Sequence, residues 1–173
     1  MQKKFSYPIK IDELTQNEYV YKIEATADEL VDICSILQVE NVNSFSAQLH
    51  LKLNLREHLL RVWGNVKASL VLQSVVTLNN FEQKYDVPFE LFFDTKATYR
   101  DIREIDNGIN DDIPDIIENG TINLADIAIE QIALQIDDYP RAEGEIFEFK
   151  CQDDEGEATE KENPFAVLQK LVK

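Results

Sequence analysis

Two histidines are the only imidazoles that could activate a nucleophile in this chain of 173 residues. His50 falls at a polar position of an alternating run and His58 in a polar connection, so we expect both to be ordinary surface residues. Five scattered glycines offer no phosphate-binding loop, and no GxSxG, Walker A or GxGxxG pattern occurs. We therefore predict that the protein is not an enzyme and has no cofactor.

Carboxylates and thiols are the remaining candidates for a metal site. The runs Asp111-Asp112 and Asp153-Asp154-Glu155 lack the alternate ligand spacing, central glycine and terminal glutamate of a calcium loop. Cys34 and Cys151 are too few for a thiolate site or a disulfide framework. We expect solvated acidic loops, reduced thiols and no bound metal.

A small basic face could contact nucleic acid. Lys52, Arg61 and Lys67 are expected on the polar side of one hairpin, with Trp63 beside them as a ring on which a base could stack. The alternative is a solvated sheet face with one partly covered tryptophan. Binding of RNA there would have to overcome a net charge of −16 on the whole chain.

All of that net charge lies in one segment. Residues 101–160 hold 19 acidic residues against Arg103, Arg141 and Lys150, whereas the charges of the remaining residues sum to zero. Such a field repels phosphate backbones and attracts basic polypeptides. We therefore expect the direct partner to be a protein.

Hydrophobic periodicity predicts both helices and strands. Thr26 and Glu29 have the spacing of a capping box before a short amphipathic helix. Alternating runs over 45–54 and 60–72 predict an antiparallel hairpin. A further strand pair is expected over 75–81 and 85–93, with Pro88 placing its second strand at an edge or a bulge.

Two further helices are expected later in the chain. Asn123 can cap a helix through Ile136, and Asn163-Pro164 can open a final helix with Phe165 on its apolar side. These elements predict an α+β fold: an antiparallel sheet that could curl into a partly closed barrel, with flanking helices. We expect one domain over 1–173 with an acidic, loop-rich segment at about 101–160. No leader or membrane span is evident, so we expect a cytoplasmic protein.

Five motifs, in order and at fitting spacings, resemble the YceD family, whose members are called large ribosomal RNA subunit accumulation proteins. The likeness runs from about Phe5 to Leu171 and is most similar to the alphaproteobacterial branch. The motifs are Gly64-Asn65-Val66-Lys67-Ala68, Gln73-Ser74-Val75-Val76-Thr77-Leu78, Glu130-Gln131-Ile132-Ala133-Leu134, Tyr139-Pro140-Arg141 with Gly144, and Asn163-Pro164-Phe165-Ala166-Val167-Leu168.

The resemblance implies a non-enzymatic role in bacterial 23S rRNA accumulation and large-subunit biogenesis. It also implies a candidate partner, ribosomal protein L32, whose gene commonly neighbours those of the family. We expect the acidic segment to hold a basic ribosomal protein, with contact to 23S rRNA indirect. The alternative is direct binding of precursor 23S rRNA by the basic face. The candidate partner-binding residues are those of the later motifs: Glu130, Gln131, Tyr139, Pro140, Arg141, Asn163, Pro164 and Phe165.

One departure from the family concerns metal. Many relatives carry Cys-x-x-Cys where this chain has Ser74-Val75-Val76-Thr77, and a second cysteine cluster where it has Tyr139-Pro140-Arg141. Hydroxyls are poor substitutes for thiolates toward zinc. We therefore expect no structural zinc in this chain.

Overall fold

The computed structural model describes residues 5–96 and 114–146. The chain separates into two compact units, 1–143 and 144–173, and only residues 144–146 of the second unit are described. All helices and strands among the described residues belong to the first unit. That the whole chain forms one domain stays a prediction.

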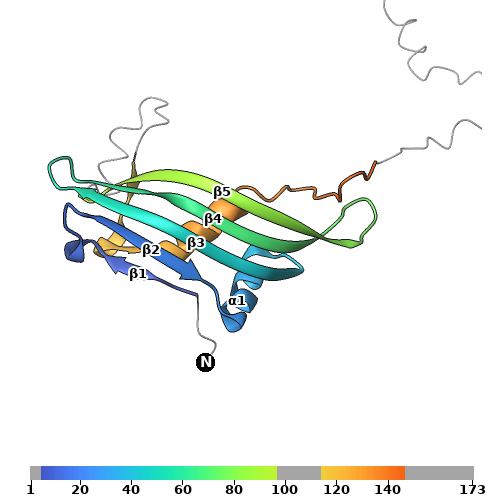
Figure 1. Ribbon diagram of the computed structural model, residues 1–173. Coiled ribbons are helices and arrows are strands. Elements are labelled where there is room, and N and C mark those ends of the chain that lie inside the picture. The colour runs from blue at the N-terminus through green and yellow to red at the C-terminus, as the bar shows by residue number, and fades with distance from the viewer. Residues whose placement is uncertain (1–4, 97–113, 147–173) are drawn as a thin grey trace, which may run out of the picture. The chain divides into compact units, whose positions relative to one another are not determined.

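The centre of the first unit is a five-stranded sheet in the order β2-β3-β4-β5-β6 (Figure 1). Strands β2 to β5 are antiparallel, and the short β6 runs parallel to the end of β5. Because β2 and β6 end the order, the sheet is open over the described residues, and the expected partly closed barrel is not formed. The strands are β2 Glu18–Glu24, β3 Asn41–Asn54, β4 Leu59–Gln73, β5 Asn80–Asp94 and β6 Asp115–Ile116.

The predicted hairpin is confirmed as β3 and β4, whose alternating side chains give the sheet one apolar and one polar face. Leu51 lies opposite Val62 and Leu53 opposite Leu60, so the apolar positions of the two strands share the inner face. These positions form the centre of the core. Completely buried side chains on this face are Leu49, Leu51, Leu60, Val62, Val66 and Leu70.

The strand predicted over 75–81 is wrong. A single strand, β5, begins at Asn80, and the preceding residues form the turn that joins it to β4. The Ser74 hydroxyl accepts hydrogen bonds from the backbone N–H groups of Val76 and Thr77, at 3.1 and 3.3 Å. A serine that satisfies turn amides in this way overrides the strand preference of the adjacent valines.

Pro88 lies on an open edge, as predicted. It is paired with Asn65 of β4, whereas β6 reaches only Phe93 and Asp94 on the other side of β5. Within the described residues the edge of β5 before Phe93 is therefore unpaired. An edge position is where a strand tolerates a residue without an N–H donor.

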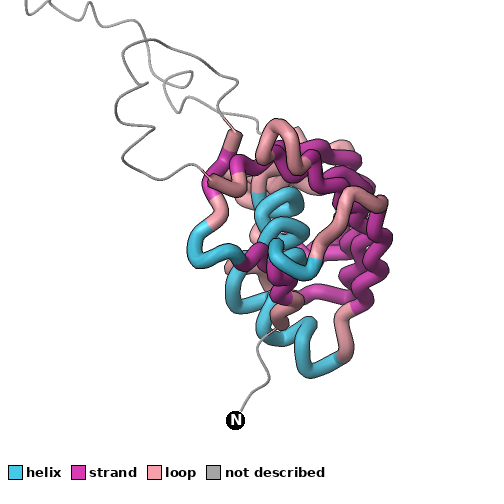
Figure 2. Tube along the Cα trace, turned by 90° about the vertical axis from the view of Figure 1, so that its left-hand side faces the viewer, coloured by secondary structure: helices cyan, strands magenta, loops and turns pink. Residues whose placement is uncertain are grey.

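Two α-helices lie on the inner face of the sheet (Figure 2). Helix α1, Ala27–Leu37, begins with the predicted capping box, in which a Glu29 carboxylate oxygen accepts from the Thr26 N–H at 2.9 Å. Helix α3, Leu124–Ala133, ends three residues before the predicted Ile136. Its buried side chains are Leu124, Ala125, Ile127, Ala128, Ile129 and Ile132.

A two-stranded ribbon, missed in the sequence, joins the start of the chain to α3. Strand β1, Pro8–Lys10, pairs with β7, Thr121–Asn123. Next to them lie the short 3-10 helices η1, Ile11–Glu13, and η2, Glu118–Gly120. Phe5, just before β1, is completely buried and packs edge-on against Phe45 of β3. The ribbon therefore closes one side of the core.

Asn123 fixes the geometry of this junction. Its Oδ1 accepts from the N–H groups of Tyr7 at 2.8 Å and Ala125 at 3.2 Å. Its Nδ2 donates to Asp126 at 2.6 Å and to the Ser6 hydroxyl at 3.2 Å. One amide thus caps α3 and ties it to the N-terminal strand.

Substituting Gly64 with alanine should destabilise the fold. Alanine in a strand is ordinarily favoured over glycine by about 0.5–1 kcal/mol. A Cβ at Gly64, however, would overlap the backbone carbonyl oxygen of Gln48 on the neighbouring strand. We expect Gly64→Ala to lower the free energy of unfolding by about 1–3 kcal/mol, measured by urea denaturation. A stabilised variant would show that β3 and β4 do not approach closely here.

Substituting Asn123 with alanine should cost more than the loss of an ordinary helix cap. A cap contributes about 1 kcal/mol, and the partly buried Tyr7 N–H would lose its acceptor as well, so we expect a loss of about 2–4 kcal/mol in urea denaturation. Asn123→Asp keeps the acceptor but loses both donated bonds, so its stability should lie between those of wild type and Asn123→Ala. Asn54→Ala, which removes an exposed acceptor for the N–H groups of Arg56 and Glu57, is the control. Equal losses at positions 54 and 123 would contradict the assigned role.

Candidate functional site

Two of the family motifs meet at one end of the sheet. The turn between β4 and β5 contains the Ser74-Val75-Val76-Thr77 motif, and the segment after α3 contains Tyr139-Pro140-Arg141. The Val75 N–H donates to the Pro140 carbonyl oxygen at 3.0 Å. Segments far apart in the sequence are therefore joined directly by their backbones.

The turn itself is held by hydrogen bonds. Ser74 is completely buried, its carbonyl oxygen accepts from the Leu78 N–H at 2.9 Å, and its N–H donates to the Asn79 carbonyl oxygen at 2.9 Å. The Ser74 hydroxyl, as a neutral acceptor already engaged by the turn amides, does not suit a zinc ion. Among the described residues no group of three His, Cys, Asp or Glu side chains is arranged to hold a metal. That the whole chain binds no zinc stays a prediction.

Negative charge continues through the described part of the acidic segment. Residues 114–146, the described part of the acidic segment, contain eight acidic residues and a single base, Arg141. Glu130 on α3 is exposed, and so are Asp137 and Asp138 after the helix. Cationic groups of a partner could therefore approach several carboxylates here.

The pKa values of two side chains record this environment. Although Glu130 is exposed, neighbouring protein atoms partly desolvate its carboxyl and raise its pKa above the ordinary value, and the charges of Asp126 and Asp115 raise it further. Burial also raises the pKa of Tyr85 on β5, with an added contribution from the charge of Asp137. Only the smaller, electrostatic contributions to these shifts come from neighbouring carboxylates, and it is these that a nearby cation would offset.

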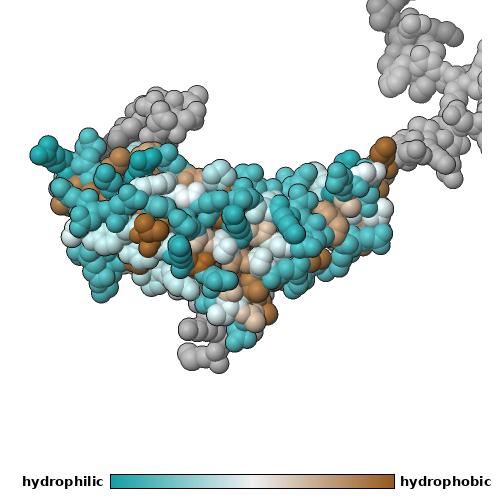
Figure 3. Space-filling model, viewed as in Figure 1, coloured by the Kyte–Doolittle hydropathy of each residue, from teal (hydrophilic) through white to brown (hydrophobic). Residues whose placement is uncertain are grey.

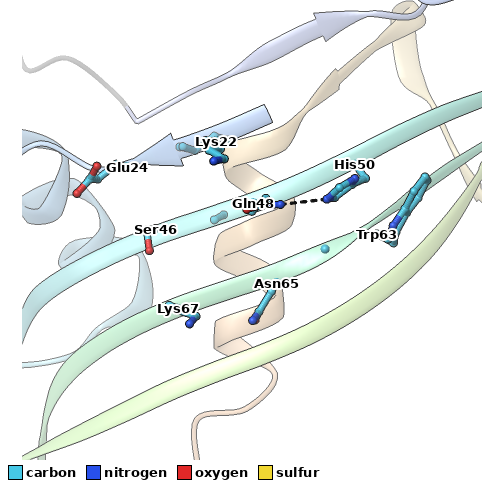
Figure 4. A pocket seen from close by; sticks show the side chains of 11 residues that line it. Lys22, Glu24, Ser46, Gln48, His50, Trp63, Asn65 and Lys67 are labelled. Atoms are coloured by element: carbon cyan, nitrogen blue, oxygen red, sulfur yellow. Dashed lines mark hydrogen bonds between the residues drawn. The ribbon is translucent and has the colours of Figure 1, made fainter. Parts of the chain in front are cut away.

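The structure places the predicted basic face on one side of the sheet. Lys52 lies opposite Arg61, and Trp63 opposite His50, on the polar outer face of β3 and β4. The Arg61 guanidinium lies 4.5 Å from the centre of the Trp63 ring, and the His50 ring stacks on the same tryptophan at 5.3 Å. Figure 4 shows Trp63, His50 and Lys67 around a shallow pocket on this face.

Carboxylates from the flanking strands accompany these bases. Arg61 pairs with Glu90 at 2.5 Å, and Lys67 Nζ lies 3.3 Å from Asp86. The outer surface along the strands is mostly hydrophilic (Figure 3), but it is not basic. The register of β2 to β5 places on it the bases Lys22, Lys52, Arg61, Lys67 and Lys84 and the acids Glu18, Glu24, Glu82, Asp86, Glu90 and Asp94.

The remaining candidates fall into three groups. Glu130 faces outward and Gln131 is half-buried, on a helix whose other side is in the core. Cys34 is half-buried, and its thiol donates to the Val39 carbonyl oxygen at 3.0 Å. Asn163, Pro164, Phe165 and Cys151 lie outside the described residues, as do the other parts of the acidic segment, 101–113 and 147–160.

Replacing Glu130 with glutamine should stabilise the protein near pH 7. The folded-state pKa is raised, so ionisation of this carboxyl opposes folding above the unfolded-state pKa, and glutamine removes that penalty. We expect Glu130→Gln to raise the melting temperature at pH 7, and the gain to vanish as the pH falls below the ordinary carboxyl pKa. Asp138→Asn is the control for the change in net charge. A gain that persists at low pH would point to a different cause.

Comparisons with known proteins complete the site. No curated protein and no solved structure matches the chain. None of the helices among the described residues is long and apolar enough to cross a membrane. A family model described as large ribosomal RNA subunit accumulation protein YceD matches residues 62–172, a range that includes the joined motifs, α3 and the acidic segment. The description of the family names accumulation of large-subunit ribosomal RNA. The chain belongs to the YceD family.

Proposed function

We propose that this protein supports accumulation of large-subunit ribosomal RNA by binding a basic ribosomal protein through its acidic segment, 101–160. The protein would act by binding, without catalysis, and the rRNA would be affected through the ribosomal protein. Ribosomal protein L32 is the first candidate, because the family resemblance associates the two genes. The family description supports the process, and charge supports the kind of partner.

The observation that carries the proposal is the separation of charge along the chain. The net charge of −16 lies entirely in residues 101–160, whereas the outer face of the sheet has bases and acids in nearly equal number. In the described part of the segment, Glu130 already bears an electrostatic cost from its neighbours. A lysine or arginine of a partner would relieve that cost, so binding should favour a cation at this point.

Complementary charge also suits the task. A basic ribosomal protein binds RNA of any sequence through its phosphates, and an acidic surface competes for the same cationic groups. Long-range attraction would speed encounter with that protein. The acidic segment would thus hold its partner until the correct rRNA site displaces it.

Direct RNA binding by the outer face is the second candidate. A specific observation in its favour is that Trp63 and the Arg61 guanidinium lie together on this face, since both can stack on a base. The His50 ring stacks on the same tryptophan, so a base would have to displace it. Against it, Arg61 and Lys67 are each paired with a carboxylate. This reading requires those pairs to open when RNA binds.

Three variants separate the two functions. Two of them remove the same number of negative charges from different places, and the third removes positive charges from the outer face. The first combines Glu130→Gln, Asp137→Asn and Asp138→Asn. The second removes three exposed acids elsewhere, by Glu13→Gln, Glu24→Gln and Glu40→Gln. The third removes cations from the outer face, by Lys52→Gln and Lys67→Gln. Each is used to capture proteins from bacterial extract with and without nuclease treatment and, separately, to bind a precursor 23S rRNA fragment and purified L32.

We expect the first variant to lose about tenfold in affinity for the ribosomal protein, which corresponds to roughly 0.5 kcal/mol for each exposed charge pair. The second and third variants should bind like wild type, and raising the salt concentration should weaken all of them. Capture that disappears with nuclease, together with RNA binding lost only in the third variant, would instead establish the outer face as an RNA site.

A further inference from the structure

Leu78 combines two features that are individually unfavourable in a turn. Its φ is 59°, in the left-handed region that a bulky side chain rarely adopts, and its side chain is 68% exposed. Among the described residues the other non-glycine positions with positive φ are polar: Gln38, His58 and Asn119. Glycine or asparagine would suit the backbone of Leu78 better, so folding alone does not account for the leucine.

Two more exposed apolar side chains lie nearby in the chain's fold, one in the same turn and one in the segment after α3. Val75 is 46% exposed in the turn, and Tyr139 is 67% exposed in the segment hydrogen-bonded to it. We call Val75, Leu78 and Tyr139 the Leu78 patch. The three side chains come from two segments whose backbones are joined at Val75, and neighbouring exposed apolar side chains are typical of interaction sites.

The backbone beneath the patch is firmly held. The Leu78 N–H is bonded to Ser74, and its carbonyl oxygen accepts from Gln73 Nε2 at 3.2 Å. The Tyr139 N–H donates to Asp137 Oδ1 at 3.0 Å. A patch held in advance loses little conformational entropy when a partner binds.

The charges next to the patch indicate what the partner carries. Asp137 and Asp138 immediately precede Tyr139, Glu143 follows nearby, and Arg141 is the single base among them. Three carboxylates against one guanidinium complement a cationic chain. The apolar side chains complement an apolar one.

We propose that the Leu78 patch is a docking surface for a basic protein segment that carries an apolar side chain between lysines or arginines. The apolar side chain contacts Leu78 and its neighbours, and the flanking cations lie against Asp137 and Asp138. This deepens the proposed function, on which it rests, because it adds a contact that charge alone does not provide. It also explains a strained leucine where glycine would fold more readily.

The test uses the full chain and two labelled synthetic peptides of equal length and charge. Both are lysine-rich, and they differ only in having leucine or serine at the central positions. Affinity is measured by fluorescence anisotropy, and stability by thermal unfolding. Wild type should bind the leucine peptide about tenfold more tightly than the serine peptide, as expected for burial of one leucine side chain.

Leu78→Gly should abolish this preference while leaving the melting temperature unchanged or raised, because glycine relieves the positive φ. Tyr139→Ser should weaken the preference without involving that backbone strain. Leu55→Gly is the matched control, since Leu55 is 50% exposed in the turn at the other end of β4. It should retain the preference.

The outcomes distinguish the patch from the acidic segment. If wild type binds both peptides equally, or if Leu78→Gly and Tyr139→Ser keep the preference, the patch is not a docking surface, although the acidic segment can still bind basic partners. If wild type binds neither peptide at low salt, the charge-based function fails together with the patch.

Discussion

The side-chain amide of Asn123 is the contact on which the arrangement of the first unit most depends. It bonds to the backbone of the N-terminal segment and to the first turn of α3 at the same time. An aspartate or serine could cap the helix, but neither offers both an acceptor and two donors. The position of α3 over the sheet therefore depends on this residue together with the apolar side chains that the helix buries.

The site at the end of the sheet depends on the same placement. Helix α3 leads directly into the segment that carries Asp137, Tyr139 and Pro140, and the Pro140 carbonyl oxygen meets the Val75 N–H. Hydrogen bonds of Ser74 shape the turn on the other side. Two short motifs, neither with a regular secondary structure of its own, are therefore positioned by a helix and a hairpin. The exposed apolar side chains and the carboxylates beside them are a product of that junction.

Sequence periodicity was sufficient to predict long elements that bury one face. The alternation through Leu49 and Leu51 predicted β3, and Thr26 with Glu29 predicted the start of α1. It failed at Val75, because two valines resemble a strand while the preceding serine supplies the hydrogen bonds of a turn. Strands β1, β2 and β7 were missed because they are short or have weak alternation, and their pairing is set by long-range contacts such as that of Asn123. The polar face was located correctly, but its carboxylates from β2 and β5 became evident only from the register.

Pro88 has a consequence for how partners can engage this protein. The edge of β5 is unpaired over most of its described length, and such an edge ordinarily invites a further strand from another chain. In the middle of that edge, however, a pyrrolidine ring stands where an incoming carbonyl would need an N–H. Charged Asp86 and Glu90 flank it on the outer face. A strand from another molecule would therefore find no N–H at the centre of the described edge, which disfavours growth of the sheet from one molecule to the next.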